Sequence, residues 1–172
     1  MPPRAVRKTN ATVLFAVEGE TEFAFLSNVK QDFVARNVNV SIKLRNAYGH
    51  GPLGIVDALM SGSKGKDYDY FAALFDSDIP ICAESLAYFT ANNVTIFQSS
   101  PAIEGTLLRL GNVKLKKNIT TAECKKLFAK HYPGDSTDMR FYERHFNHAL
   151  IQSRRQQIKV MDDIIKYMLS PS

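Results

Sequence analysis

The chain has 172 residues, which is enough for one domain with a full-size hydrophobic core. Its composition is 45% hydrophobic and 23% charged, as in ordinary globular proteins, and this excludes a largely disordered chain. The net charge of +5 permits attraction to a polyanion such as nucleic acid but does not demand it.

Cysteine usage and the absence of targeting patterns favour a cytoplasmic protein. Cys82 and Cys124 are widely separated and form no metal-binding motif, so a reduced compartment is the default. Residues 1–11 form a basic tail without the apolar run of a signal peptide. No segment is long and apolar enough to span a bilayer, so we expect no membrane association.

Residues 12–26 are the stretch around which the predicted fold is organised. The apolar run 13–17, rich in Val and Phe, is typical of a strand buried on both faces of a parallel sheet. It ends abruptly at Glu18, and Gly19 lets the chain turn sharply into a helix predicted over about residues 20–36.

The following segments alternate between strand and helix. Residues 38–44 alternate apolar and polar side chains, which predicts a strand at or near a sheet edge. The later elements are a helix over 52–60, a strand over 70–75, a helix over about 81–92, a strand over 94–97 and a helix over about 102–110. This order predicts an α/β core over residues 12–111, with right-handed crossovers and a mostly parallel four-stranded sheet with flanking helices.

The composition changes after Gly111. Residues 112–118 form a basic connector, and helices are predicted over 121–131 and about 139–169, separated by a Pro-Gly break. We therefore expect residues 112–172 to form a basic, helical C-terminal extension packed on the core.

Acidic residues follow three of the predicted strands. Glu18 and Glu22 flank the first strand–helix junction, Asp76 and Asp78 follow the third strand, and Glu104 follows the fourth. Two aspartates two residues apart on an extended segment point the same way, and parallel strands bring all these ends to one sheet edge. Carboxylates gathered there repel one another unless a cation lies among them, and oxygen ligands without His or Cys favour Mg²⁺ or Mn²⁺.

Three segments resemble motifs of the TOPRIM fold, the metal-binding domain of topoisomerases, primases and several nucleases. They are VEGETE at 17–22, DSD at 76–78 and SSPAIE at 99–104. The chain is most similar to the small RloB-like branch, and also to the TOPRIM half of OLD-family nucleases, over about residues 12–110. The residues that match the family motifs are Glu18, Gly19, Glu22, Asp76, Asp78, Ser99, Pro101 and Glu104.

The resemblance implies a Mg²⁺-dependent nuclease that hydrolyses phosphodiester bonds in DNA or RNA. Glu18, Asp76 and Asp78 would bind one divalent ion, with Mn²⁺ as a substitute for Mg²⁺, and Glu22 and Glu104 would complete a second site. In this family the first glutamate is also assigned as a general acid or base, a second role open to Glu18. The resemblance further implies bacterial or phage defence, with an ABC-type ATPase as a possible partner.

Several residues have a structural interpretation beside the functional one. The carboxylates could be helix caps or solvated charges, and Ser99 and Ser100 are expected to cap the helix that follows. His50, in a Gly-rich loop, could contact the scissile phosphate or shuttle a proton, or could be an ordinary turn residue. Basic residues of the C-terminal extension could hold phosphates or form a solvated helical face. They are Lys114, Lys116, Lys117, Arg140, Arg144, Arg154 and Arg155.

Two other classes of function stay open from the sequence. The chain could be a non-catalytic or partner-dependent nucleic-acid-binding subunit of an ATPase-containing defence complex. It could also act on a nucleotide or another small phosphorylated ligand, although the chain has no Gly-x-x-x-x-Gly-Lys loop of the kind that binds ATP.

Overall fold

The computed structural model describes residues 10–34 and 39–172. The basic tail predicted over residues 1–11 lies almost wholly outside these ranges, and so do the end of the first predicted helix and the start of the second predicted strand. Within the described ranges, no helix is both long and apolar enough to cross a membrane.

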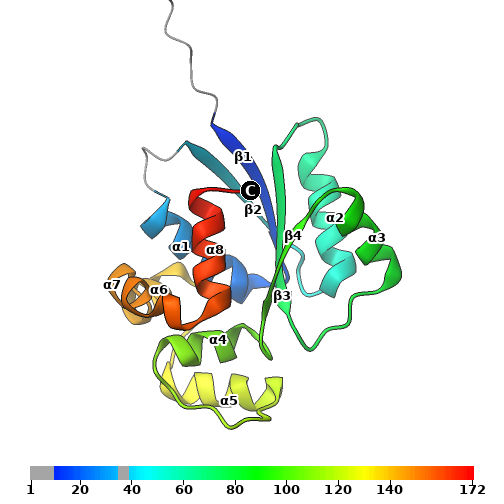
Figure 1. Cartoon of the computed structure of the whole chain (residues 1–172). Helices are drawn as coiled ribbons and strands as arrows, with labels where there is room; N and C mark the ends of the chain where they lie inside the picture. The colour runs from blue at the N-terminus through cyan, green and yellow to red at the C-terminus, as the bar shows by residue number, and fades with distance from the viewer. Residues whose placement is uncertain (1–9, 35–38) are drawn as a thin grey trace, which may run out of the picture.

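The core is a sheet of four parallel strands in the order β2-β1-β3-β4 (Figure 1). The strands are β1 (Ala11–Val17), β2 (Val40–Asn46), β3 (Tyr70–Asp76) and β4 (Thr95–Ser99). Helices flank the sheet, so the predicted α/β fold with a parallel four-stranded sheet is confirmed, in a Rossmann-like arrangement.

Burial follows the sequence patterns of the strands. Residues 13–17 of β1 and 72–75 of β3 have exposed fractions of 0%, as expected for central strands covered on both faces. β2 lies at the edge, and its exposed residues Ser41, Lys43 and Arg45 alternate with more buried ones. The edge position predicted from the alternating pattern is therefore confirmed.

One face of the sheet is covered by α2 (Gly51–Ser63) and α3 (Ala83–Ala91), drawn on the right in Figure 1. Leu14 of β1 packs in one cluster with Ile55 of α2 and Phe89 of α3. The helices bury their apolar side chains here, and this burial is the main source of stability for the layer.

The other face is covered by α1 (Glu20–Phe33) and by C-terminal helices, above all α8 (Lys159–Leu169) (Figure 1). Tyr167 of α8 makes edge-on ring contacts with Phe15 of β1 and Phe97 of β4, at centroid distances of 6.3 and 5.5 Å. The C-terminal helices thus complete the hydrophobic core of the sheet.

The remaining helices lie beside this layer. They are α4 (Ile103–Leu110), α5 (Thr121–His131), α6 (Met139–His145) and α7 (His148–Arg154), followed by a 3₁₀ turn (Arg155–Gln157). The helix predicted over 121–131 is confirmed, but a continuous helix over 139–169 is wrong. Asn147 interrupts it because its side-chain oxygen accepts a hydrogen bond from the Leu150 amide at 3.1 Å and starts a new helix.

The carboxyl ends of the strands meet at one edge of the sheet. Val17 is paired with Asn46 on one side and with Leu74 on the other, and Asp76 is paired with Ser99. Residues that follow these positions are therefore held close together, at the edge where α/β proteins bind ligands.

Candidate active site

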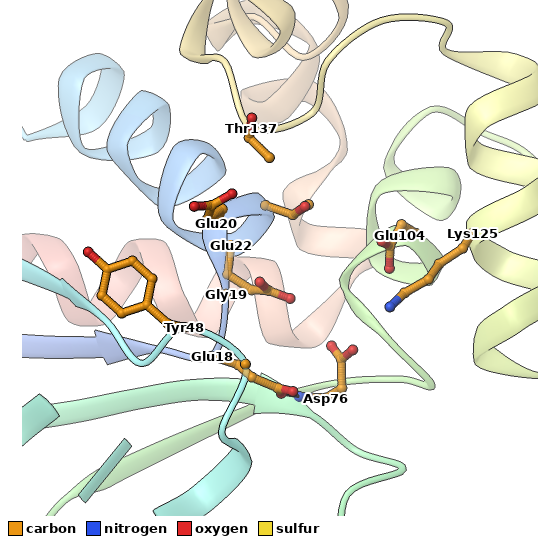
Figure 2. Close-up of a pocket in the computed structure, with 11 residues that line it drawn as sticks. Glu18, Gly19, Glu20, Glu22, Tyr48, Asp76, Glu104, Lys125 and Thr137 are labelled. Atoms are coloured by element: carbon orange, nitrogen blue, oxygen red, sulfur yellow. Dashed lines mark hydrogen bonds between the residues drawn. The ribbon is translucent and has the colours of Figure 1, made fainter. Parts of the chain in front are cut away.

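A pocket of about 410 Å³ opens at the carboxyl edge of the sheet (Figure 2). Its acidic lining consists of Glu18, Glu20, Glu22, Asp76 and Glu104. The other lining residues are Gly19, Thr21, Tyr48, Gly49, Lys125 and Thr137. Side chains that are far apart in the sequence therefore converge here, as the strand-end pattern predicts.

Glu18 connects the ends of the two central strands. Its Oε2 accepts a hydrogen bond from the Asp76 amide at 3.1 Å, and its own amide donates to the Leu74 carbonyl at 3.1 Å. Its carbonyl accepts a hydrogen bond from the Gly49 amide at 2.7 Å. Partial burial raises the pKa of Glu18, against the lowering effect of the Asp76 amide.

Asp76 ends β3 with only 7% of its surface exposed. Its Oδ1 accepts a hydrogen bond at 2.9 Å from the amide of Ile103, the first residue of α4. Ala102, at the N-cap position of α4, has no side-chain acceptor, so Asp76 at the end of β3 caps the helix instead. The prediction that Ser99 or Ser100 caps this helix is therefore wrong.

Glu22 and Glu104 are buried in the first turns of α1 and α4, with 6% and 8% of their surfaces exposed. Glu104 Oε2 is buried and has no hydrogen-bond partner among the described residues. Helix N-termini favour negative charge, yet Glu104 Oε2 lacks the partner that a buried charge needs.

The pKa values show how strongly this arrangement disfavours ionised carboxylates. Burial is the largest cause for Glu22, and together with repulsion by Glu104 and Glu18 it raises the pKa to about 7. Burial, and then repulsion by Glu22, Glu18 and Glu104, raises the pKa of Asp76 to about 8. Burial also raises the pKa of Glu104. The pocket lacks the positive charge that would balance its carboxylates.

Lys125 of α5 is the basic residue among the lining residues of this pocket. Figure 2 shows its amine directed toward the space between Glu104 and Asp76. Its charge lowers the pKa values of Glu18, Glu22 and Glu104, but it does not reverse the effect of burial. Within the described residues Lys125 forms no ion pair. It belongs to the cluster of basic residues at the start of the C-terminal extension, but no motif distinguishes it from the other lysines there.

Asp78 and His50 lie outside the pocket lining. β3 ends at Asp76 and the chain turns at once, with the Ile79 amide donating to the Asp76 carbonyl at 3.3 Å. The expectation that Asp76 and Asp78 project together from an extended segment is therefore wrong. Asp78 is exposed and accepts a hydrogen bond from the Thr121 hydroxyl of α5. His50 is exposed at the N-cap position of α2.

The basic residues predicted to bind nucleic acid do not line this pocket. Four of them have partners within the molecule. Three form ion pairs, Lys116 with Glu123, Arg140 with Asp138 and Arg155 with Asp162, and Arg154 donates a hydrogen bond to Asn112. Lys114 lines a different pocket, together with Arg154. Lys117 and Arg144 are exposed. These partners reduce the charge that the C-terminal helices can offer to a phosphate.

The carboxylates share a pocket but are not arranged as a finished metal site. Across residues 10–34 and 39–172, no group of three or more His, Cys, Asp or Glu side chains is placed so that it could hold a metal ion. Comparisons with protein-family models, curated proteins and solved structures gave no match for this chain. Its function must therefore be argued from the chemistry of the pocket.

Proposed function

We propose that the acidic pocket binds a divalent cation, Mg²⁺ or Mn²⁺, and that the protein is a metal-dependent nuclease acting on DNA or RNA. The observation that carries this proposal is the convergence of Glu18, Glu22, Asp76 and Glu104 in one pocket that only partly balances their charge. Such clusters of buried carboxylates with raised pKa values are typical of functional sites.

The donor chemistry of the pocket suits a hard dication, and the carboxylates would have to move closer together to hold one. Glu104 Oε2 is buried without a partner in the part of the chain that the structure describes, so one carboxylate oxygen is available to coordinate. Asp76 uses Oδ1 to accept from Ile103, which leaves Oδ2 for a cation. Glu22 supplies a third carboxylate, and the pocket lining includes no His or Cys, which favours Mg²⁺ or Mn²⁺ over zinc.

Each residue has a role in phosphodiester hydrolysis. A bound Mg²⁺ would supply Lewis-acid stabilisation of the phosphate and lower the pKa of an attacking water. Glu18 holds Oε2 against the Asp76 amide, so Oε1 is free to accept the proton of that water. Lys125 contributes an ammonium group that can pair with a phosphate oxygen and offset the charge that develops there.

Alternatives that need a protein nucleophile have less support. The described lining of the pocket includes no Ser or Cys, and the Thr21 and Thr137 hydroxyls have no histidine beside them in it. The motif resemblance to RloB-like TOPRIM proteins supports the same activity. A role in bacterial or phage defence beside an ABC-type ATPase is part of this proposal and rests on that resemblance.

A cleavage assay tests the proposal. Purified chain is incubated with labelled single-stranded and duplex DNA and with RNA, in Mg²⁺, in Mn²⁺ and in EDTA. We expect cleavage with either metal, none in EDTA, and a loss of at least about 100-fold in Asp76→Asn. Asp67→Asn, an exposed aspartate in the loop before β3, is the matched control and should cleave normally. Undiminished cleavage in EDTA would contradict the proposal.

A further inference from the structure

A second pocket, of about 500 Å³, adjoins the acidic one. The two pockets share Glu20, Tyr48 and Thr137 as lining residues. The second pocket continues along β2, and its lining includes Lys43 and Arg45 of that strand and Phe23 of α1. A ligand that fills the acidic pocket therefore has a continuous path along the edge strand.

Tyr48 stands at the junction of the two pockets. It is 72% exposed, well above Phe23 at 36%. Its backbone is fixed in the left-handed region at φ 56°, where its amide donates to Asn46 Oδ1 at 2.7 Å. The next amide, of Gly49, donates to the Glu18 carbonyl. The turn that carries the exposed ring is thus attached to the residue that carries a pocket carboxylate.

Figure 2 shows Tyr48 on the side of the acidic pocket opposite Lys125. An exposed aromatic ring beside a polar pocket offers a flat apolar face to a ligand that extends out of it. A nucleobase is such a ligand, since every base has a face that can stack on tyrosine.

The charged residues that line the two pockets change from acidic to basic beyond Tyr48. Lys43 and Arg45 are exposed on β2, the edge strand of the described sheet, and the strand register places their side chains on the face that α2 covers, with Arg45 near Gly62. Neither forms an ion pair with a described carboxylate. Glu20 is the acidic residue at the boundary, so a phosphate is attracted to the β2 end of the second pocket and repelled from the boundary.

We propose that the second pocket is a subsite for one unpaired nucleotide of a single-stranded nucleic acid, next to the bond to be cleaved. The base stacks on Tyr48, and the backbone phosphate lies against Lys43 and Arg45. This proposal rests on the proposed function, whose substrate it specifies as single-stranded. In a duplex both faces of an internal base are covered by its neighbours, so only an unpaired base can reach the ring. The volume lies within the range of about 300–1,000 Å³ that is usual for ligand pockets.

Binding measured without cleavage tests the subsite. Fluorescence anisotropy is recorded with short labelled single-stranded DNA, single-stranded RNA and a blunt DNA duplex, in EDTA and in Ca²⁺. We expect Tyr48→Ala to weaken binding of a single strand by about 5- to 100-fold, and Tyr48→Phe to stay within about twofold of wild type because the ring remains. Duplex binding should not respond to either change, and the DNA and RNA arms show which polymer depends on Tyr48.

The phosphate contacts have their own readout. Lys43→Ala should reduce the slope of log K against log salt concentration by about 0.7 for a single strand. Leu86→Ala, an exposed apolar residue of α3, and Lys66→Ala, in the loop before β3, are matched controls outside both pockets. Both controls should bind as wild type does.

The outcomes separate this subsite from the nuclease activity. Binding that depends on Tyr48 in a chain that never cleaves would support the subsite and refute the nuclease. Metal-dependent cleavage in which Tyr48→Ala binds single strands as tightly as wild type would overturn the subsite alone. An equal loss for single strand and duplex would also overturn it.

Discussion

Replacing Asp76 with asparagine removes a buried carboxyl group that titrates but retains the cap of α4, because the asparagine Oδ1 can still accept the Ile103 hydrogen bond. Burial and neighbouring carboxylates raise the pKa of Asp76 from 3.8 to about 8. The folded chain therefore binds the proton more tightly than the unfolded chain does. Its contribution to stability is complete below pH 3.8, falls as the pH rises, and is lost once the pH exceeds about 8.

The size of the effect follows from the width of that pH window. Each pH unit above 3.8 costs about 1.4 kcal/mol until the folded-state pKa is reached. At neutral pH the Asp76 carboxyl group of metal-free wild type contributes about 4 kcal/mol less to stability than it does in acid. This is a large share of the total stability of a domain, which is about 5–15 kcal/mol. Asp76→Asn should recover about 2–4 kcal/mol of this loss, raising the melting temperature by about 5–10 °C.

A divalent metal should reduce the difference in stability between the two proteins, because it stabilises wild type more than Asp76→Asn. A metal that binds only the folded chain, present at about 100 times its dissociation constant, stabilises wild type by about 2.7 kcal/mol. Asp76→Asn lacks this ligand and should gain little from the metal. Urea unfolding at about pH 8, in EDTA and in Mn²⁺, measures both effects. Destabilisation of Asp76→Asn in EDTA, or an equal response of both proteins to Mn²⁺, would refute the reasoning.

Three other substitutions test separate parts of the account. Lys125→Met should move the acidic limb of the pH–rate profile to higher pH, because Lys125 lowers the pKa values of Glu18, Glu22 and Glu104; an unchanged profile would remove it from the site. Glu104→Gln should weaken Mn²⁺ binding by at least about tenfold in calorimetry, whereas Glu84→Gln, outside the pocket, should not. Tyr167→Ala should cost about 3–5 kcal/mol in urea unfolding, because its ring packs on Phe15 and Phe97; a loss below about 1 kcal/mol would mean that α8 adds little to the core.

The strands and the meeting of the acidic residues could be predicted from the sequence. Apolar runs that end at Glu18 and Asp76 indicate buried parallel strands, and parallel pairing brings their ends together whatever the details of the loops. Glu22 and Glu104 follow in the first turns of the next helices, so their positions depend on local sequence alone.

Other features depend on contacts that local patterns do not report. Lys125 belongs to an exposed face of α5, and only the packing of that helix directs the amine into the pocket. The chain turns after Asp76, so Asp78 accepts a hydrogen bond from Thr121. The spacing of the two aspartates alone predicted instead that Asp78 and Asp76 point the same way. A count of basic residues also gives no sign that Lys116 is already paired with Glu123.

The most direct test of the central claim is anomalous diffraction from crystals soaked in Mn²⁺. We expect a peak in the acidic pocket, coordinated by carboxylate oxygens of Glu22, Asp76 and Glu104. A pocket without a peak at saturating Mn²⁺, with Lys125 and the carboxylates unmoved, would contradict the claim that these residues gather to hold a dication.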